Sequence, residues 1–198
     1  MKSALLFSLL IFAGLTHADV KNNEAAPEFK LKDMKGKDHS LSDFKGKWVV
    51  LEWFNKDCPF VVKHYGSNNM QKIQKTYTDK GVVWLTMYST DKSVSGFEAG
   101  EAALKTQQNL KGHSSFLLDD NAGVVGRQYG AKTTPHMFII SPDQKIVYQG
   151  AIDDTPSTDA GDIPKSKNYV SQALDEALAG KAITAANTRS YGCSVKYK

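Results

Sequence analysis

Two short runs of the sequence are apolar at nearly every position, and they constrain the fold more than any other feature. They are WVVLEWF, residues 48–54, and VVWLTMY, residues 82–88. A strand that is apolar on both sides has to be covered on both faces, as in a parallel sheet. Between the two runs, apolar residues recur at helical spacing from Val62 to Tyr77, and Gly81 ends the pattern. The sequence therefore predicts a strand, a helix and a second strand of an α/β fold.

The remaining sequence continues this alternation and ends in a hairpin. Helical patterns cover residues 97–111, 123–129 and 169–179. Strand patterns cover residues 29–31, 116–118, 137–140 and 145–152, and a Pro-Asp turn joins the last two. Residues 36–44 read as a turn followed by a short helical turn, and residues 153–167 read as a loop. This order predicts one α/β sandwich domain.

The N-terminal residues have the composition of a secretory signal peptide. A lysine precedes the apolar residues 4–15, and small residues lie three before and one before a cut after Ala18. A membrane anchor or a buried helix is the alternative interpretation. We expect a signal peptide over residues 1–18, a folded domain over residues 19–180 and a C-terminal tail over residues 181–198. The mature protein is then secreted, in the periplasm, without a membrane attachment.

The charge and the cysteine content exclude several classes of protein. The formal net charge is +4 at pH 7 and the lysines are scattered, which is typical of a solvated surface and gives no reason to expect a nucleic-acid partner. The two cysteines, Cys58 and Cys193, have no C-x-x-C spacing, so we expect no zinc site and no cofactor. Export would place both cysteines where disulfides can form.

Cys58 lies between a buried strand and a helix, and Pro59 suits the first helical position. The unpaired N–H groups and the dipole of a helix N-terminus favour the thiolate, by roughly 0.3–1 kcal/mol at an exposed site. Lys56 and Lys63 would add to this effect, and Asp57 would oppose it. Because the thiolate is the reactive form of cysteine, Cys58 is a candidate nucleophile. The alternative is an inert thiol that only packs.

Three further residues are candidates for the same site. Glu52 lies in the middle of a buried strand, where burial raises the pKa of a carboxyl toward the range useful for proton transfer, unless its tip reaches solvent. Pro135 precedes a late strand, and a Thr-Pro step there is compatible with a cis peptide bond. His136 is a candidate proton carrier or metal ligand, although a lone histidine is more often a hydrogen-bonded structural residue.

Taken together, WVVLEWFNKDCPF, YGAKTTPHMFII, IVYQGAIDD and the ending YGCSVKY resemble the thioredoxin superfamily. The resemblance covers roughly residues 25–180 and is to the redoxin branch, which includes the peroxiredoxin-like, AhpC/TSA-related proteins. It implies a thioredoxin-like three-layer α/β sandwich with a mixed central sheet. It also implies that Cys58 is the first active-site cysteine, that Pro135 is the cis-proline and that Glu52 is the buried acid.

The sequence departs from two active-site patterns of these proteins. Val61 stands where the second cysteine of C-x-x-C would be, so a dithiol cycle within that motif is impossible. The peroxiredoxin pattern P-x-x-x-T-x-x-C is also absent, because Leu51 and Asn55 replace its proline and threonine. Arg127, the arginine nearest to the late strand, is expected on the surface of a short helix. Stabilisation of a peroxide transition state is therefore not evident from the sequence.

Cys193 is the remaining candidate partner of Cys58. A flexible, glycine-flanked tail can fold back and resolve an oxidised or mixed-disulfide Cys58. A permanent Cys58–Cys193 disulfide that ties the tail down, and no bond at all, are the alternatives.

The favoured hypothesis is an exported, antioxidant-type thiol oxidoreductase that acts on protein thiols, disulfides or hydroperoxides and takes electrons from an unknown reductant. In it, Cys58 attacks, Glu52 and His136 handle protons, Pro135 shapes the substrate edge and Cys193 resolves. A redox-inactive binding module is the second hypothesis. A copper chaperone is the third, with Cys58, His136 and Cys193 as ligands.

Overall fold

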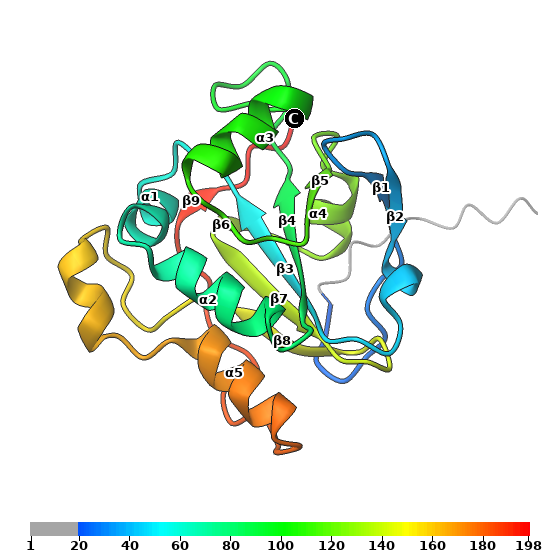
Figure 1. Cartoon of the computed structure of the whole chain (residues 1–198), viewed down its shortest axis with the longest axis vertical. Helices are drawn as coiled ribbons and strands as arrows, with labels where there is room; N and C mark the ends of the chain where they lie inside the picture. The colour runs from blue at the N-terminus through cyan, green and yellow to red at the C-terminus, as the bar shows by residue number, and fades with distance from the viewer. Residues whose placement is uncertain (1–19) are drawn as a thin grey trace, which may run out of the picture.

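The computed structural model describes residues 20–198, and a central sheet organises them. Its five strands lie in the order β5-β4-β3-β7-β8 (Figure 1). Their bounds are β3 Val49–Phe54, β4 Val83–Tyr88, β5 Phe116–Asp119, β7 His136–Ile140 and β8 Ile146–Gly150. β3 runs parallel to β4 and antiparallel to β7, so the sheet is mixed. All residues of β3 and β4 are buried, as their apolar sequences predict. The predicted signal peptide lies outside the described residues.

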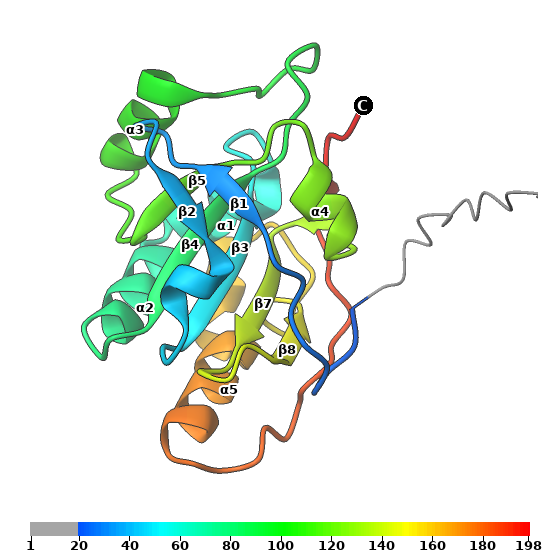
Figure 2. The same ribbon diagram turned by 90° about the vertical axis from the view of Figure 1, so that its right-hand side faces the viewer.

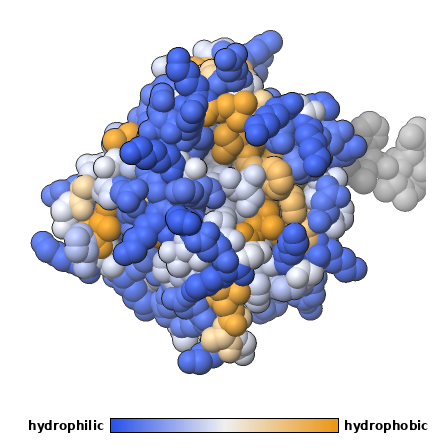
Figure 3. Space-filling model, viewed as in Figure 1, coloured by the Kyte–Doolittle hydropathy of each residue, from blue (hydrophilic) through white to orange (hydrophobic). Residues whose placement is uncertain are grey.

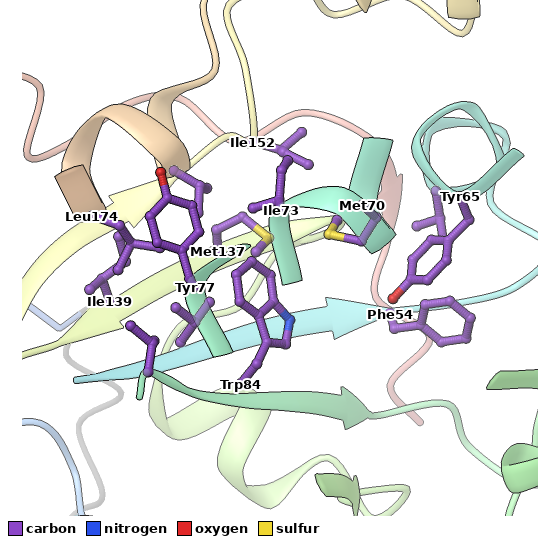
Figure 4. Packing of buried hydrophobic residues seen from close by; sticks show 14 of the residues in the cluster. Phe54, Tyr65, Met70, Ile73, Tyr77, Trp84, Met137, Ile139, Ile152 and Leu174 are labelled. Atoms are coloured by element: carbon purple, nitrogen blue, oxygen red, sulfur yellow. The ribbon is translucent and has the colours of Figure 1, made fainter. Parts of the chain in front are cut away.

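Helices cover both faces of this sheet and give three layers (Figures 1 and 2). The core on one face includes residues from α1 Pro59–Gly66, α2 Asn69–Thr78, α3 Gly100–Asn109 and α5 Tyr169–Leu178. Figure 4 shows this core, where Ile73 and Tyr77 of α2 and Leu174 of α5 pack over Trp84, Met137 and Ile139 of the sheet. The other face is covered by α4 Val124–Gln128 and by the segment that contains β1 Lys30–Lys32, β2 Asp38–Ser40 and the 3-10 turn Leu41–Phe44.

The helix expected between the two apolar strands is broken, so the prediction of one continuous run up to Gly81 is wrong. α1 ends at Gly66 and α2 begins at Asn69. The Ser67 hydroxyl donates to the main-chain oxygen of Lys63 at 2.7 Å, and Asn68 has a φ of 62°. A serine side chain that bonds the preceding turn competes with the helical ladder, and a left-handed residue ends a helix.

The other elements follow the sequence with small differences. α3 begins at Gly100 rather than at residue 97, and the predicted loop after residue 153 contains the short 3-10 helix Ala160–Lys165. The strand β2 lies within residues 36–44, for which the sequence predicts a turn and a short helical turn; its residues Asp-His-Ser are all polar and carry no apolar strand pattern. The predicted hairpin of β7 and β8 is confirmed.

The C-terminal tail returns across the domain instead of leading away from it. β9, Cys193–Ser194, pairs antiparallel with β6, Thr133–Thr134, just before β7 (Figure 1). Figure 2 shows the tail running along the side of the molecule from α5 past β8 toward α4. At its end, the Tyr197 hydroxyl donates to the main-chain oxygen of Ala131 at 2.9 Å. Gly126 leaves room for this ring, because a Cβ there would lie 2.2 Å from the Tyr197 hydroxyl oxygen.

The surface of the described residues is mainly hydrophilic. Figure 3 shows the molecule from the same side as Figure 1, and on this side the hydrophobic residues form separate patches among hydrophilic ones. The large hydrophobic side chains that are exposed are Val62, Phe97, Val124 and Leu178. Within residues 20–198, none of the helices combines the length and the hydropathy that crossing a bilayer requires.

Candidate active site

The turn between β3 and α1 places Cys58 at the N-terminus of a helix. Cys58 is the N-cap residue, with Pro59 inside the first turn, and its main-chain oxygen accepts from the Val62 N–H at 2.9 Å. Asn55 shapes the turn: its main-chain oxygen accepts from the Cys58 N–H at 3.2 Å and its side-chain oxygen accepts from the Asp57 N–H at 2.9 Å. The predicted strand, turn, cysteine and helix are therefore present.

Two segments that are distant in the sequence meet at the Cys58 sulfur. Cys58 is 2% exposed, and its thiol donates to the main-chain oxygen of Thr134 at 2.9 Å. Thr134 is opposite Cys193 in the register of β6 and β9, and the Cys193 side chain is hydrogen-bonded to Cys58. Both cysteines are free thiols, with Cys193 the more exposed of the two. The tail therefore brings the second thiol of the chain directly to the first.

The surroundings give the two thiols different acidities. Burial alone raises the pKa of Cys58, but the Cys193 thiol, the Thr134 side chain and the nearby N–H groups of Val61 and Cys193 outweigh it and lower that pKa below its ordinary value. Burial, and then the Cys58 sulfur, raise the pKa of Cys193 to about 11. Of the pair, Cys58 is the one that forms the thiolate more readily, and Cys193 stays protonated beside it.

The lysines that the sequence offered as thiolate partners are engaged elsewhere. The Lys56 ammonium contacts the Asp57 carboxylate at 2.7 Å. Lys63 is buried and donates to the main-chain oxygen of Thr155 at 3.0 Å. The groups that lower the pKa of Cys58 are thus hydrogen-bond donors rather than cations.

Glu52 belongs to β3, and its side chain is buried on the face of the sheet that α1 and α2 cover, so its tip does not reach solvent. It is 0% exposed. Its carboxyl accepts from the Trp84 indole at 2.7 Å, the Tyr65 hydroxyl at 2.9 Å and the Gln74 amide at 3.0 Å. Burial raises the pKa of Glu52 in spite of these hydrogen bonds. Its carboxyl is therefore held in the core by donors from both the sheet and the helix layer.

Pro135 and His136 are consecutive residues, but they lie near different faces of the sheet. The Thr134–Pro135 peptide bond is cis, as the resemblance implies, and it adjoins the Cys58 sulfur through Thr134. His136 begins β7, and its ring packs on Phe138 with centroids 4.6 Å apart. Because side chains alternate along a strand, His136 and Phe138 share the face opposite the core that contains Cys58. The structure brings Pro135 to the thiol pair and places His136 on the other side.

The residues that stand in place of the peroxidatic pattern have structural partners. The Asn55 side chain holds the turn and also donates to the Thr90 hydroxyl at 3.3 Å. Arg127 donates to the main-chain oxygens of Ala122 and Lys198. Arg127 thus binds the end of the tail rather than the Cys58 sulfur.

A family model described as the AhpC/TSA family matches residues 23–149. That range contains β3, Cys58, the cis-proline and most of the final hairpin, and it ends before the tail. The chain belongs to the AhpC/TSA family. The predicted resemblance is thereby confirmed. Cys193 lies beyond the part of the chain that this family model describes.

Known proteins that are similar to this chain can be compared with it. The thiol-disulfide oxidoreductase ResA of Bacillus thuringiensis is 30% identical over 126 residues, which is 63% of this chain and 66% of ResA, slightly less than two thirds of its length. The structure of an uncharacterized conserved protein from Geobacillus kaustophilus is 28% identical, with a TM-score of 0.74 over 90% of this chain and 93% of that one.

A third comparison confirms the fold. The thioredoxin domain of a thiol-disulfide oxidoreductase from Bacteroides vulgatus superposes with a TM-score of 0.54 at 23% identity, over 74% of this chain and 98% of that chain. The predicted thioredoxin-like α/β sandwich is therefore confirmed. The prediction of a thiol-based oxidoreductase agrees with the family and with the name of ResA.

Sequence reasoning missed Thr134, whose main-chain oxygen accepts from the Cys58 thiol in this AhpC/TSA chain. Its place before a proline at the start of an apolar strand was the available signal. The copper hypothesis needs Cys58, Cys193 and His136 together, and His136 lies on the other face of the sheet. Across residues 20–198, the His, Cys, Asp and Glu side chains form no group of three that can hold a metal.

Proposed function

We propose that this protein is a thiol-disulfide oxidoreductase that cycles between a Cys58/Cys193 dithiol and a Cys58–Cys193 disulfide. The contact between the two thiols across β6 and β9 carries the proposal. It supplies the second cysteine that the sequence CPFV lacks, from the opposite end of the chain. The similarity to ResA, a thiol-disulfide oxidoreductase by name, supports disulfides as the substrates.

The first step is attack of the Cys58 thiolate on a substrate disulfide. The substrate S–S bond breaks, a mixed disulfide forms at Cys58, and the leaving thiolate takes up a proton from solvent. The Cys58 thiolate is favoured by its position at the N-terminus of α1 and by the donors around its sulfur. The cis-proline edge, Thr134–Pro135, adjoins this sulfur and is where the substrate chain would lie.

The second step is attack of Cys193 on the Cys58 sulfur. The sulfur of Cys58 is one cause of the raised pKa of Cys193. Once Cys58 is in a mixed disulfide it no longer carries a negative charge, so Cys193 loses its proton more easily at that stage than before. The substrate thiolate leaves and takes that proton. The substrate has then gained two electrons, and the two cysteines have lost two to form their disulfide.

An external dithiol has to return the two electrons, as in any cycle of this kind. Glu52 and His136 remain proposals as proton carriers: Glu52 is buried with a raised pKa on the face of the sheet below α1 and α2, and His136 lies on the other face. We also propose that the protein acts outside the cytoplasm after removal of residues 1–18, where disulfide substrates persist. N-terminal sequencing of the protein from fractionated cells tests this, with Asp19 as the expected first residue.

The test of the cycle uses three proteins: the unsubstituted chain, Cys58→Ser and Cys193→Ser. Each is reduced, mixed with one equivalent of a disulfide-bonded peptide, quenched with acid, alkylated and analysed by mass. We expect a Cys58–Cys193 disulfide in the unsubstituted protein, a stable mixed disulfide on Cys58 in Cys193→Ser and no reaction in Cys58→Ser. Full peptide reduction by Cys58→Ser would refute the proposal. Reaction with hydrogen peroxide but not with the peptide would make the substrate a peroxide.

A further inference from the structure

A buried charged cluster joins the helix that begins at Cys58 to the tail that carries Cys193. Lys63 and His64 lie on α1, and Asp153 follows β8. The Asp153 carboxylate is 3.7 Å from the Lys63 ammonium and 3.8 Å from the His64 ring nitrogen. The side chains of Lys63 and His64 are 0% exposed and that of Asp153 is 2% exposed. A buried ion pair of this kind is costly to build, and neither part of the cycle described above uses it.

The tail enters this cluster through Tyr191. Its hydroxyl donates to the Asp153 carboxylate and lies 3.5 Å from the His64 ring nitrogen. Its ring packs edge-on against Phe60 of α1, with centroids 5.6 Å apart. Asp153 thus accepts a hydrogen bond from the tail while α1 neutralises its charge.

The tail has little other support just before Cys193. Thr188, Arg189 and Ser190 line two cavities, each of about 610 Å³. Thr188 is hydrogen-bonded to β8 and to the residue that follows β8, and this pairing of the tail with β8 does not continue beyond Thr188. Tyr191 is therefore the first residue after these three that fixes the path of the chain into Gly192 and Cys193.

We infer that Asp153 and Tyr191 are positioning residues that seat the tail so that Cys193 meets Cys58; this role rests on the proposed dithiol cycle. Lys63 and His64 hold Asp153, Asp153 holds Tyr191, and Tyr191 sets the register in which Cys193 faces Thr134. Lys63 and His64 belong to α1, the helix whose N-cap is Cys58. The positions of both sulfurs are therefore set by the same helix.

The test compares Tyr191→Phe with Tyr77→Phe. Tyr191→Phe keeps the ring against Phe60 and removes the hydroxyl that bonds Asp153 and contacts the His64 ring, while Lys63 still neutralises the Asp153 charge. Tyr77→Phe removes a comparable tyrosine bond, 2.9 Å to the main-chain oxygen of Ser171, in the body of the domain. Each protein is equilibrated with mixtures of reduced and oxidised glutathione. The fraction with a Cys58–Cys193 disulfide then gives the effective concentration of one thiol at the other.

We expect Tyr191→Phe to lower this effective concentration by about tenfold, since the variant loses the hydrogen bond to a charged group that holds the tail against the domain. Tyr77→Phe should leave it unchanged even where it lowers the melting temperature. Hydrogen exchange at the Val195 N–H, which bonds the Lys132 oxygen at 3.1 Å, should speed up in Tyr191→Phe only.

Two results would overturn the inference while the dithiol cycle stands: an unchanged effective concentration in Tyr191→Phe, or an equal loss in Tyr77→Phe. If the unsubstituted protein forms no Cys58–Cys193 disulfide at any glutathione ratio, the proposed function fails and the positioning role fails with it.

Discussion

Gly192 is the position at which a single methyl group should separate the two thiols. It has a φ of +136°, and a Cβ built there would lie 2.1 Å from the main-chain oxygen of Thr134 and 2.8 Å from its carbonyl carbon. Real Cβ atoms essentially never come closer than 3.0 Å to another heavy atom, so the tail of Gly192→Ala has to retreat by about 0.9 Å or change its path. The obstacle is main chain next to a proline, which cannot rotate away.

The strain should appear as a loss of tail docking. A non-glycine residue in this region of backbone space costs on the order of 1–3 kcal/mol, which corresponds to about a 5- to 150-fold change in an equilibrium. Cys193 follows Gly192 directly, so the population with the thiols in contact should fall by a factor in this range. The pKa of Cys58 should rise in the variant, because the Cys193 thiol is one of the donors that lower it.

The assay measures how fast the Cys58–Cys193 disulfide closes after one equivalent of a small disulfide has reacted with Cys58. Gly180→Ala is the matched control, because Gly180 also has a positive φ, +68°, but a Cβ there meets nothing within 4 Å. Both variants should lose some stability, and only Gly192→Ala should close slowly. Equal closing rates in the two variants, with circular dichroism spectra unchanged, would refute the reasoning.

Two further predictions concern buried groups. Burial raises the pKa of Glu52, so the native state is destabilised as the pH rises above the ordinary value of about 4.5 and this carboxyl has to ionise. Glu52→Gln should therefore raise the melting temperature at pH 8 and have a smaller effect at pH 4; a lower melting temperature than the unsubstituted protein at pH 8 would contradict this. Burial, with Lys63 adding to it and Asp153 opposing it, lowers the pKa of His64 to about 4. Its contribution to stability is complete above pH 6.5 and is lost as the pH falls toward 4, on the order of 3 kcal/mol in all. Urea titrations from pH 7 to pH 4 should show this slope, and His64→Gln should flatten it.

The sheet and its helices were open to prediction because their signals are local. β3 and β4 are apolar at almost every position, and the helices repeat apolar residues along one side, so each element can be recognised within a short window. The break between α1 and α2 escaped this reasoning because a serine bond and one left-handed residue outweighed the helical pattern. Cys58 and Pro135 were recognised because each lies at a fixed place relative to a strand.

The sequence by itself determined an α/β domain with a cysteine at a helix N-terminus and a second cysteine near the end of the chain. Only the tertiary structure decided that β9 pairs with β6, that Cys193 meets Cys58 there, and that Tyr191 bonds Asp153 beside α1. The physical reason is the range of the interactions. A helix or an apolar strand is specified by neighbours a few residues apart, whereas the pairing of a two-residue strand depends on the path of the whole chain between its partners. His136 illustrates the same limit: its place beside Pro135 suggested the active site, and the alternation of β7 directed its side chain to the opposite face.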